Sequence, residues 1–468
     1  MDSPICPGCR ERDARIARLE AEVADLRKTV ADLAARLGTN ATNSSIPPSA
    51  NPLDAPKPVK KKKSKKRRGA QKGHPPHLRQ LLPLERVSKF VPFVPRQCDH
   101  CAAPLPAEAQ PHDPPPHRFQ TIELRPIVTT VTEYQGHART CAGCGHVSTA
   151  VIPADVRAHS IGPRLSATLS YFTGCHGMSK RAVEETAEAI FQAPIAVGTV
   201  CNLEQEMSAA LAAPHEEALQ AVRAAAVKGA DETGWKIAGL KCWLWAAATT
   251  NVAAFVIHLK RSKQGLKALL GEVVLGILCS DRWSVYNAVP EKRRQACWAH
   301  LKRDFQKIVD GDGPSVWVGR RGRRLVKKVF AVWHAYRDGQ VTREQMQSQM
   351  QKSADSMNRL LVEGHFVGTD PQVARFCANL LEIEAALWTF TRVEGVEPTN
   401  NHMERLLRRA VLWRRRSFGC ASARGCRFVE RILTAVQTRR LRDQDVLSYL
   451  HEALVAHRAG RPAPSLLT

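Results

Sequence analysis

The sequence predicts a multidomain protein with a mixed α/β core, a helical insertion and smaller N-terminal units. Three observations support this prediction. The chain has 468 residues, which is too long for one ordinary domain. From residue 226 onward strand-like runs alternate with helical patterns, whereas the earlier segments carry cysteine pairs, helices and a Pro- and Lys-rich stretch. A hydrophobic content of 44% is sufficient for real cores.

The charge balance points to a polyanionic partner. The chain carries 69 Lys and Arg against 44 Asp and Glu, a formal net charge of +25. Such an excess favours nucleic acid or an anionic membrane surface. The N-terminus, MDSPICPGC, has no apolar signal region, and polar residues that suit a turn interrupt the longest uncharged run, 242–259. We therefore expect an intracellular, cytoplasmic protein without a membrane span, whose 14 cysteines are thiols or metal ligands.

Residues 1–45 are predicted to form an N-terminal hook and a parallel coiled coil, or leucine zipper. Apolar residues from Ile16 to Leu37 recur at alternating spacings of three and four. β-branched residues at one core position and Leu at the other favour two parallel strands, hence a homodimer or larger assembly. An amphipathic helix packed on its own domain is the alternative. The role of the preceding hook, Cys6-x-x-Cys9, stays open; one reading is a zinc ion shared by two chains.

Residues 46–80 have the composition of a disordered, Pro- and Lys-rich basic linker. Their basic block is usually solvated, yet it would add sequence-independent phosphate binding. The predicted DNA-binding residues of this block are Lys60, Lys61, Lys62, Lys63, Lys65, Lys66, Arg67 and Arg68.

Residues 81–155 are predicted to be a small zinc-binding domain. Two hooks, Cys98-x-x-Cys101 and Cys141-x-x-Cys144, offer the four thiolates of a tetrahedral structural zinc. The long segment between them contains β-type residues that suit a hairpin. We therefore predict one structural Zn²⁺ per chain, with two unrelated thiol pairs as the alternative.

Residues 156–225 are predicted to be helical, with Ser179 as a helix cap. Two consecutive helices with a break between them resemble a helix-turn-helix. The segment is locally acidic, however, which is unfavourable for a helix that lies in a DNA groove. DNA binding and a plain helical bundle both remain open.

The first part of the core, residues 226–310, contains two aspartates that follow strand-like runs. AAVKGAD is strand-like up to Asp231, and GILCSD up to Asp281. Three strands, a helix and a fourth strand open a ribonuclease-H-like sheet, in which the first and fourth strands are neighbours. The two carboxylates should then lie a few ångströms apart. Taken singly, Asp231 also suits a turn and Asp281 a helix cap.

A third carboxylate, Glu404, lies in the predicted core helix of residues 396–440, after a helical insertion of residues 311–395 and before a C-terminal tail of residues 441–468. Locally it suits a capping box with Asn401 or an ion pair with Arg408. Its neighbours would hold the DNA backbone. These predicted DNA-binding residues are Arg405, Arg408, Arg409, Arg414, Arg415 and Arg416.

Carboxylates gathered in this way suit a divalent metal. Like charges at short distance are costly unless a cation lies between them, and Mg²⁺ prefers oxygen ligands. Two metals about 4 Å apart would stabilise both the attacking and the leaving oxygen of a phosphoryl transfer. We therefore predict two Mg²⁺ or Mn²⁺ ions per active site, bound by Asp231, Asp281 and Glu404.

Trp298, shortly after Asp281, has two interpretations. It belongs either to a buried core helix or to the active site, where it would stack on an unpaired DNA base. Half of a metal site at Cys297 and His300 is a third and weaker interpretation, because no second Cys and His pair lies nearby.

In their order along the chain, these motifs resemble a DDE transposase of the insertion sequence 66 family. The similarity covers nearly the whole length through NSSIPPS, GAQKGH, the two cysteine hooks, GADETGWK, CSDRWSVYN, CWAHLKRDF and PTNNHMER…WRRRSFG. The resemblance implies that Asp231, Asp281 and Glu404 are the catalytic triad. It also implies binding to the terminal inverted repeats of a mobile element, and help from small accessory transposition proteins encoded beside it. We expect target DNA as a further partner and association with the nucleoid.

Two other functions are compatible with parts of the sequence. One is a ribonuclease-H-fold nuclease that cuts DNA without strand transfer. The other is a non-catalytic zipper and zinc DNA-binding regulator, which explains residues 1–150 but leaves the strand-end carboxylates without a role.

Overall fold

The structure is a computed structural model that describes residues 7–37, 79–124, 126–311 and 313–468. The basic block of the predicted linker, 60–68, and Cys6 of the first hook lie outside these residues. The chain divides into two compact units, one of Met1–Ala55 with Thr129–Thr468 and one of Pro56–Val128.

The smaller unit is extended over most of its described length and contains one short helix, η2 (Leu84–Arg86). Two of its segments lie side by side because the Gln120 side chain binds the backbone of Leu82. Gln120 Oε1 accepts from the Leu82 N–H at 2.8 Å, and Gln120 Nε2 donates to the Leu82 carbonyl at 3.0 Å.

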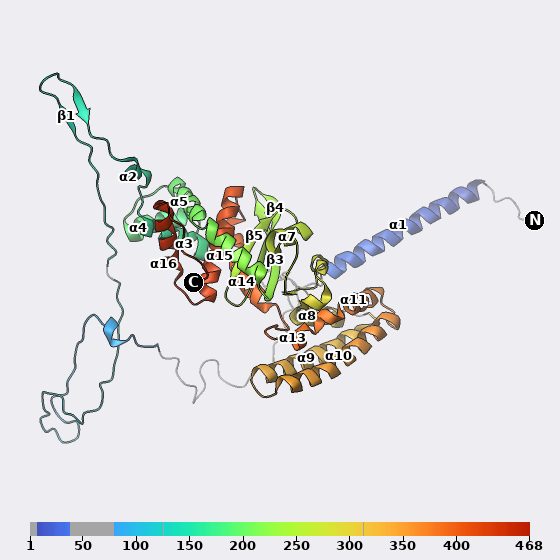
Figure 1. Ribbon diagram of the computed structural model, residues 1–468. Coiled ribbons are helices and arrows are strands. Elements are labelled where there is room, and N and C mark those ends of the chain that lie inside the picture. The colour runs from blue at the N-terminus through green and yellow to red at the C-terminus, as the bar shows by residue number, and fades with distance from the viewer. Residues whose placement is uncertain (1–6, 38–78, 125, 312) are drawn as a thin grey trace, which may run out of the picture. The chain divides into compact units, whose positions relative to one another are not determined.

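Helix α1 (Pro7–Leu37) covers the segment with the alternating apolar spacing (Figure 1). The predicted core positions whose side chains the structure describes are exposed, from 46% for Val23 to 64% for Val30; they are Ile16, Leu19, Val23, Leu26 and Val30. The helix is thus present, and the predicted two-stranded coil remains a proposal.

A short hairpin, β1 (Ala138–Thr140) and β2 (Val147–Thr149), frames the hook of Cys141 and Cys144. The sequence analysis predicted a hairpin in the segment between the two hooks, whereas the hairpin of the structure surrounds the second hook. Among the described residues of this region, strand pairing comprises these three residues on each side of the second hook and an isolated bridge between Gln97 and Pro104 at the first.

A helical group follows, and the C-terminal part of the chain packs into it. Ser179 caps α4 as predicted, since its side chain accepts from the Ala182 N–H at 3.2 Å. The predicted C-terminal tail is instead a folded helix, α16, that packs on α3 and α5, with Leu466 fully buried beyond it. The helices of this group are α2 (Ala154–Ala158), α3 (Pro163–His176), α4 (Lys180–Phe191), α5 (Val197–Ala210), α6 (Ala212–Ala224), α15 (Ala423–Leu441) and α16 (Val446–Arg458).

The core of the larger unit is a five-stranded mixed sheet in the order β5-β4-β3-β6-β7. In this sheet β4 pairs antiparallel with both β3 and β5, whereas β6 and β7 run parallel to β3. The strands are β3 (Val227–Ile237), β4 (Leu240–Ala248), β5 (Ala253–His258), β6 (Ile277–Ser280) and β7 (Arg294–Ala296). The elements between β5 and β7 are α7 (Lys263–Leu270), η3 (Ser284–Ala288) and η4 (Glu291–Arg293).

Helices cover both faces of this sheet (Figure 1). On one face, α14 (Asn401–Ser417) places Met403 and Leu407 against Trp235 and Leu244. On the other face, Trp245 belongs to a separate apolar cluster that also contains side chains of α6 and α7. The sequence predicted one core helix for residues 396–440; the structure has two, α14 and α15.

The predicted insertion is a helical layer that packs on α8 (Trp298–Asp310). Helices α8 and α9 approach closely at Gly322, where an added Cβ would lie 2.3 Å from the Phe305 ring. The helices of the insertion are α9 (Val316–Arg337), α10 (Arg343–Phe366), α11 (Pro371–Leu381), α12 (Glu384–Leu387) and α13 (Thr389–Arg392). Within the described residues, none of the helices has the length and apolar character needed to cross a membrane.

Candidate active site

The two predicted aspartates lie at the same level of the sheet. Gly229 of β3 pairs with Cys279 of β6 in a parallel ladder. Asp231 and Asp281 each follow two residues later on these neighbouring strands. Strand β3 does not end at Asp231, as the sequence suggested, because its antiparallel pairing with β4 continues to Ile237. Only the pairing on the β6 side stops before Asp231.

The acidic side chains around Asp231 lie close enough to disturb its ionisation. Burial raises the pKa of Asp231 well above its usual value, and the negative charges of Glu232, Asp281 and Glu404 raise it further. A hydrogen bond from the Glu232 N–H to Asp231 Oδ1, at 2.8 Å, acts in the opposite direction. Asp281 Oδ1 accepts from the Trp283 N–H at 2.9 Å. Asp231, Asp281 and Glu404 therefore belong to one electrostatic site.

Helix α14 brings Glu404 to this site because its first turn fits against β3. An added Cβ at Gly229 would lie 2.7 Å from the Asn400 side chain, so a larger residue there would displace the helix. Asn400, the residue before the helix, donates from Nδ2 to the Ala230 carbonyl at 2.8 Å, and its N–H donates to Cys297 Sγ at 3.1 Å.

Neither local role suggested for Glu404 describes its contacts. The cap residue of α14 is Asn400, which makes no side-chain capping bond, so the capping box of Asn401 and Glu404 is wrong. Glu404 Oε1 accepts from Arg303 Nη2 at 2.8 Å and lies 3.7 Å from His300 Nε2. Both partners lie on α8, far from Glu404 in sequence. Burial and the nearby Arg303 charge lower the pKa of His300.

Glu232 lies on the opposite face of β3, as expected for adjacent strand residues. Its carboxylate accepts two hydrogen bonds from Arg261, at 2.9 and 2.6 Å, and one from the Tyr286 hydroxyl at 2.5 Å. The Arg261 guanidinium also lies 4.0 Å from the Trp283 ring centroid and 4.8 Å from that of Trp243. Sequence reasoning missed this network, because its members share no spacing that marks them as neighbours.

The carboxylates of the site offer the oxygen ligands that Mg²⁺ prefers. Within the described parts of the chain, however, no three His, Cys, Asp or Glu side chains stand together as a ready-made metal site. Glu404 is engaged by Arg303 in this conformation. The donor chemistry of Asp231, Asp281 and Glu404 fits a divalent metal. To bind it, Glu404 would replace its ion pair with Arg303 by coordination to the metal.

The arginines of α14 divide into exposed and engaged side chains. Arg414 donates to Thr233 Oγ1 at 3.1 Å and to the Gly234 carbonyl, so it ties α14 to β3. Arg416 donates to the His176 carbonyl at 3.0 Å. The side chains that remain exposed and available for a phosphate backbone are Arg405, Arg408, Arg409 and Arg415.

Trp298 belongs to the core, which corrects its suggested stacking role on DNA. Its side chain is fully buried, and Nε1 donates to the Leu387 carbonyl at 2.7 Å. Its ring meets that of Trp388 edge to face, with centroids 5.0 Å apart. A base cannot reach this ring unless the helical layer opens.

The two cysteine hooks have the same local geometry, each within its own unit. In each, the N–H four residues after the first cysteine donates to that cysteine's carbonyl, at 2.9 Å in both. The N–H of the first cysteine donates five residues ahead, at 2.9 Å for Cys98 and 2.8 Å for Cys141. Ala102 and Gly145, the residues after the second cysteine, both have positive φ.

The first cysteine of each hook has a lowered thiol pKa, which favours its thiolate form. Backbone N–H groups of Cys101 and His100 lower the pKa of Cys98, and those at the equivalent positions after Cys141 lower the pKa of that thiol. Thiolates are the form in which cysteine binds zinc.

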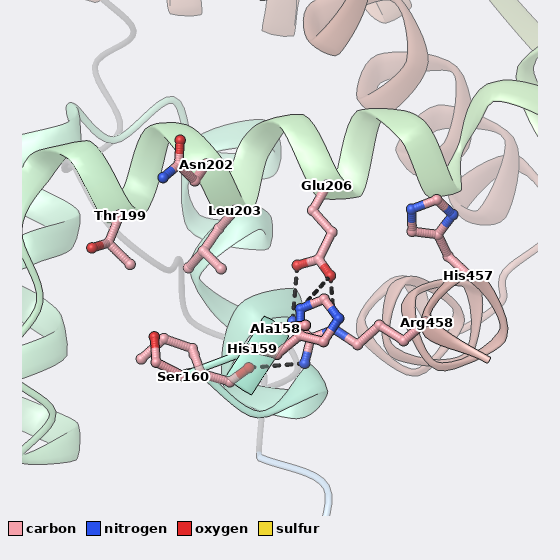
Figure 2. A pocket seen from close by; sticks show the side chains of 10 residues that line it. Ala158, His159, Ser160, Thr199, Asn202, Leu203, Glu206, His457 and Arg458 are labelled. Carbon is pink, nitrogen blue, oxygen red and sulfur yellow. Dashed lines mark hydrogen bonds and ion pairs between the residues drawn. The ribbon is translucent and has the colours of Figure 1, made fainter. Parts of the chain in front are cut away.

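A cavity of about 490 Å³ lies among α5, α16 and the segment before α3 (Figure 2). Glu206 of α5 accepts two hydrogen bonds from Arg458 of α16, both at 2.8 Å, and lies 3.3 Å from His159. Helix α5 also packs on α3 and α15. These contacts favour the helical-bundle interpretation of this segment over the helix-turn-helix.

Comparison with known families identifies the chain. The model of the Transposase IS66 family matches residues 159–427, more than half of the sequence. The chain belongs to the IS66 transposase family. Membership in a transposase family implies a DNA-processing enzyme whose partner is DNA. A second model, of a family of unknown function (DUF6444), matches residues 5–80. No curated protein matches the chain.

Proposed function

We propose that the protein is a DDE-type transposase that binds the terminal inverted repeats of a mobile element and catalyses metal-dependent cleavage and strand transfer of DNA. The observation that supports this most is geometric: Asp231 and Asp281 each stand two residues beyond the paired Gly229 and Cys279 on neighbouring strands, and α14, which carries Glu404, packs on β3. The sheet order, in which the first strand lies between an antiparallel hairpin and two parallel strands, supports a ribonuclease-H-like core.

In this proposal the three carboxylates hold Mg²⁺ or Mn²⁺, and two such ions would stabilise the attacking and leaving oxygens of a phosphoryl transfer. The other residues have supporting tasks. Arg261 and Tyr286 fix Glu232 and thereby β3 beside Asp231. The exposed arginines of α14 bind the DNA backbone close to Glu404, which orients the scissile strand without reading its sequence.

A cleavage assay on DNA that carries the ends of the element tests the proposal. Asp231→Asn, Asp281→Asn and Glu404→Gln should each abolish Mg²⁺-dependent cleavage and leave DNA binding nearly intact, because each removes a metal ligand. Glu232→Gln is the matched control, a carboxylate on the same strand that faces away from the site. Its effect on cleavage should be much milder than that of the other three variants, although loss of its charged hydrogen bonds should lower the melting temperature.

Two outcomes would revise the assignment. If Glu232→Gln abolishes cleavage and Asp231→Asn does not, the first carboxylate is misplaced by one residue. If Glu404→Gln is harmless, the third carboxylate must be sought at Glu394 or Glu397. Joining of pre-cleaved ends to target DNA separates a transposase from a nuclease of the same fold.

We also propose one structural zinc per chain, bound by Cys98, Cys101, Cys141 and Cys144, and a parallel coiled-coil dimer formed by α1. The matching hydrogen-bond pattern of the two hooks supports the first proposal. The exposed apolar stripe of α1 supports the second. Small accessory proteins and association with the nucleoid follow from the proposed function.

A further inference from the structure

Helix α9 is strongly basic along its length. Its 22 residues contain seven Lys and Arg and no Asp or Glu. The neighbouring helix α10, with 24 residues, balances three basic residues with three acidic ones. The excess of positive charge is therefore a property of α9 and not of the insertion as a whole.

The basic side chains of α9 gather on the face that points away from the core. Val318, Gly322, Val326 and Val329 are buried on the inner side of the helix. The opposite side, at the same helical spacing, forms what we call the α9 basic face. Its residues, all exposed, are Arg320, Arg323, Arg324, Lys327 and Lys328.

Arg321, at the border of this face, differs from its neighbours because its guanidinium has partners within the protein. Arg321 Nη1 donates to Glu363 at 2.6 Å, and its guanidinium lies 5.3 Å from the Trp317 ring. In the part of the chain that the structure describes, none of the five side chains of the α9 basic face makes a hydrogen bond or an ion pair. The charges of these five side chains are thus available to bind another molecule.

The spacing of these charges is unfavourable for an isolated helix. Arg320 precedes Arg324 by four residues, and Arg324 precedes Lys328 by four, so like charges face each other along the helix. Mixed charges, such as those of α10, would keep the surface solvated without this repulsion. A polyanion bound along the face would offset the repulsion between these like charges. Binding of a polyanion would therefore explain why α9 carries them.

We infer that the α9 basic face binds the phosphate backbone of duplex DNA without reading its sequence. This inference rests on the proposed function, which supplies DNA as the substrate. At 1.5 Å per residue, the span from Arg320 to Lys328 is about 12 Å, enough for about three phosphates of one strand. The face consists of Arg and Lys at the surface, and such side chains position a duplex through its phosphates.

The location of α9 connects this face to the carboxylates. Helix α9 packs on α8, and α8 carries Arg303 and His300, the contacts of Glu404. One helix therefore separates the basic face from the residue that completes the site. DNA held on α9 would restrain the duplex whose strand is cut at Asp231 and Asp281.

The test is the salt dependence of DNA binding by Arg324→Gln/Lys327→Gln. All proteins compared are full-length and carry Asp281→Asn, and the protein with this substitution alone is the parent. The probe is a DNA duplex of unrelated sequence in buffer without divalent metal. We expect weaker binding and a slope of log affinity against log salt that is shallower by about 1.8, since each lost phosphate contact removes about 0.9. Gln retains helix propensity, so the melting temperature should not change.

Lys352→Gln/Arg359→Gln on α10 is the matched control, because it removes one Lys and one Arg, both exposed, from the balanced helix. Its slope should equal that of the parent protein. Equal slopes for all three proteins, or equal reductions in both double variants, would overturn the inference. Tighter binding of an RNA duplex than of DNA, lost in the α9 variant, would overturn it as well.

Failure of this inference and failure of the proposed function give different results. Binding is measured with a protein that cannot cleave, so the slope does not depend on catalysis. Cleavage by the protein without substitutions, together with an unchanged salt slope in the α9 double variant, would reject only DNA binding by the α9 basic face. A reduced slope together with no cleavage under any metal condition would reject only the proposed chemistry.

Discussion

Arg303 Nη2 donates a hydrogen bond to Glu404 Oε1 at 2.8 Å and so joins α8 to α14 at the candidate active site. His300, one turn earlier on α8, lies 3.7 Å from the same oxygen. The third carboxylate is therefore already neutralised by a cation of the protein itself. Because Arg303 and a metal ion would share Glu404 Oε1, binding of one opposes binding of the other.

We expect Arg303→Gln to bind divalent metal more tightly than the parent protein. The variant removes a positive charge that competes for Glu404 and also repels an incoming cation. Isothermal titration with Mn²⁺ measures the change in Kd. Lys302→Gln is the control, since Lys302 is an exposed neighbour on the same helix. An equal or weaker Mn²⁺ affinity for Arg303→Gln would show that Arg303 does not compete with the metal.

The raised pKa of Asp231 predicts how stability depends on pH. Its pKa is higher in the folded protein than in the unfolded chain, so the folded state binds the proton more tightly. Between these two pKa values the folded state holds more protons, and the free energy of unfolding falls as the pH rises. A difference of one pH unit between the folded-state and unfolded-state pKa of Asp231 changes the free energy of unfolding by about 1.4 kcal/mol across the window.

Denaturant unfolding of the metal-free protein at a series of pH values checks this prediction. In Asp231→Asn the contribution should disappear, and the variant should gain stability relative to the parent protein as the pH rises through the window. Mg²⁺ should stabilise the parent protein most above the window, where the carboxylate is charged. Parallel pH curves for the two proteins would show that Asp231 titrates normally.

Trp298→Ala should destabilise the protein by about 3–5 kcal/mol, as expected for truncation of a buried aromatic residue. The variant opens a cavity beside Trp388 and leaves the Leu387 carbonyl with the longer hydrogen bond from Gln295 Nε2, at 3.3 Å, as its remaining side-chain contact among the described residues. Unfolding monitored by circular dichroism measures the loss. Any reduction in cleavage should be the same on paired and on mismatched DNA ends. Normal stability together with a defect that mismatched ends rescue would restore the stacking role.

Sequence reasoning placed Asp231 and Asp281 together because neighbouring parallel strands bring equivalent positions to the same level. It also predicted that the first and fourth strands of the sheet are neighbours, a helical segment over residues 12–37 and the Ser179 cap. The last two depend on local patterns. It could not find the contact of Glu404 with Arg303, because 101 residues separate them and no periodicity relates α8 to α14.

Two errors had usable signals. The C-terminal segment was predicted to be a tail, although Asp445 caps α16 by accepting from the Leu447 N–H, and its buried stripe begins with Val446, Tyr449 and Leu450. The extension of β3 beyond Asp231 was visible as alternation up to Trp235, which is buried. The burial of Trp298 depends on Leu387 and Trp388 in the insertion, so tertiary packing alone decided between its two interpretations.

Zinc content tests the two cysteine hooks. Freshly isolated, reduced protein should contain about one zinc ion per chain by elemental analysis, the content of a single four-thiolate site. Cys98→Ser and Cys141→Ser should each reduce this content strongly, because both remove a thiolate whose pKa the hook itself lowers. Cys201→Ser is the control; this half-buried cysteine lies within α5 and should leave the zinc in place.

Removal of the metal should have a local structural effect. Each hook is a short turn held by two backbone hydrogen bonds, and the hairpin of β1 and β2 around the second hook has exposed strands without a core of their own. A chelator should therefore increase amide exchange and proteolysis around Cys98 and Cys141, while the α/β core remains folded. Zinc-free protein that is equally protected at both hooks would contradict a structural role. Zinc content that persists in Cys98→Ser would place the ligand set elsewhere, with the Cys6 and Cys9 hook as the next pair to substitute.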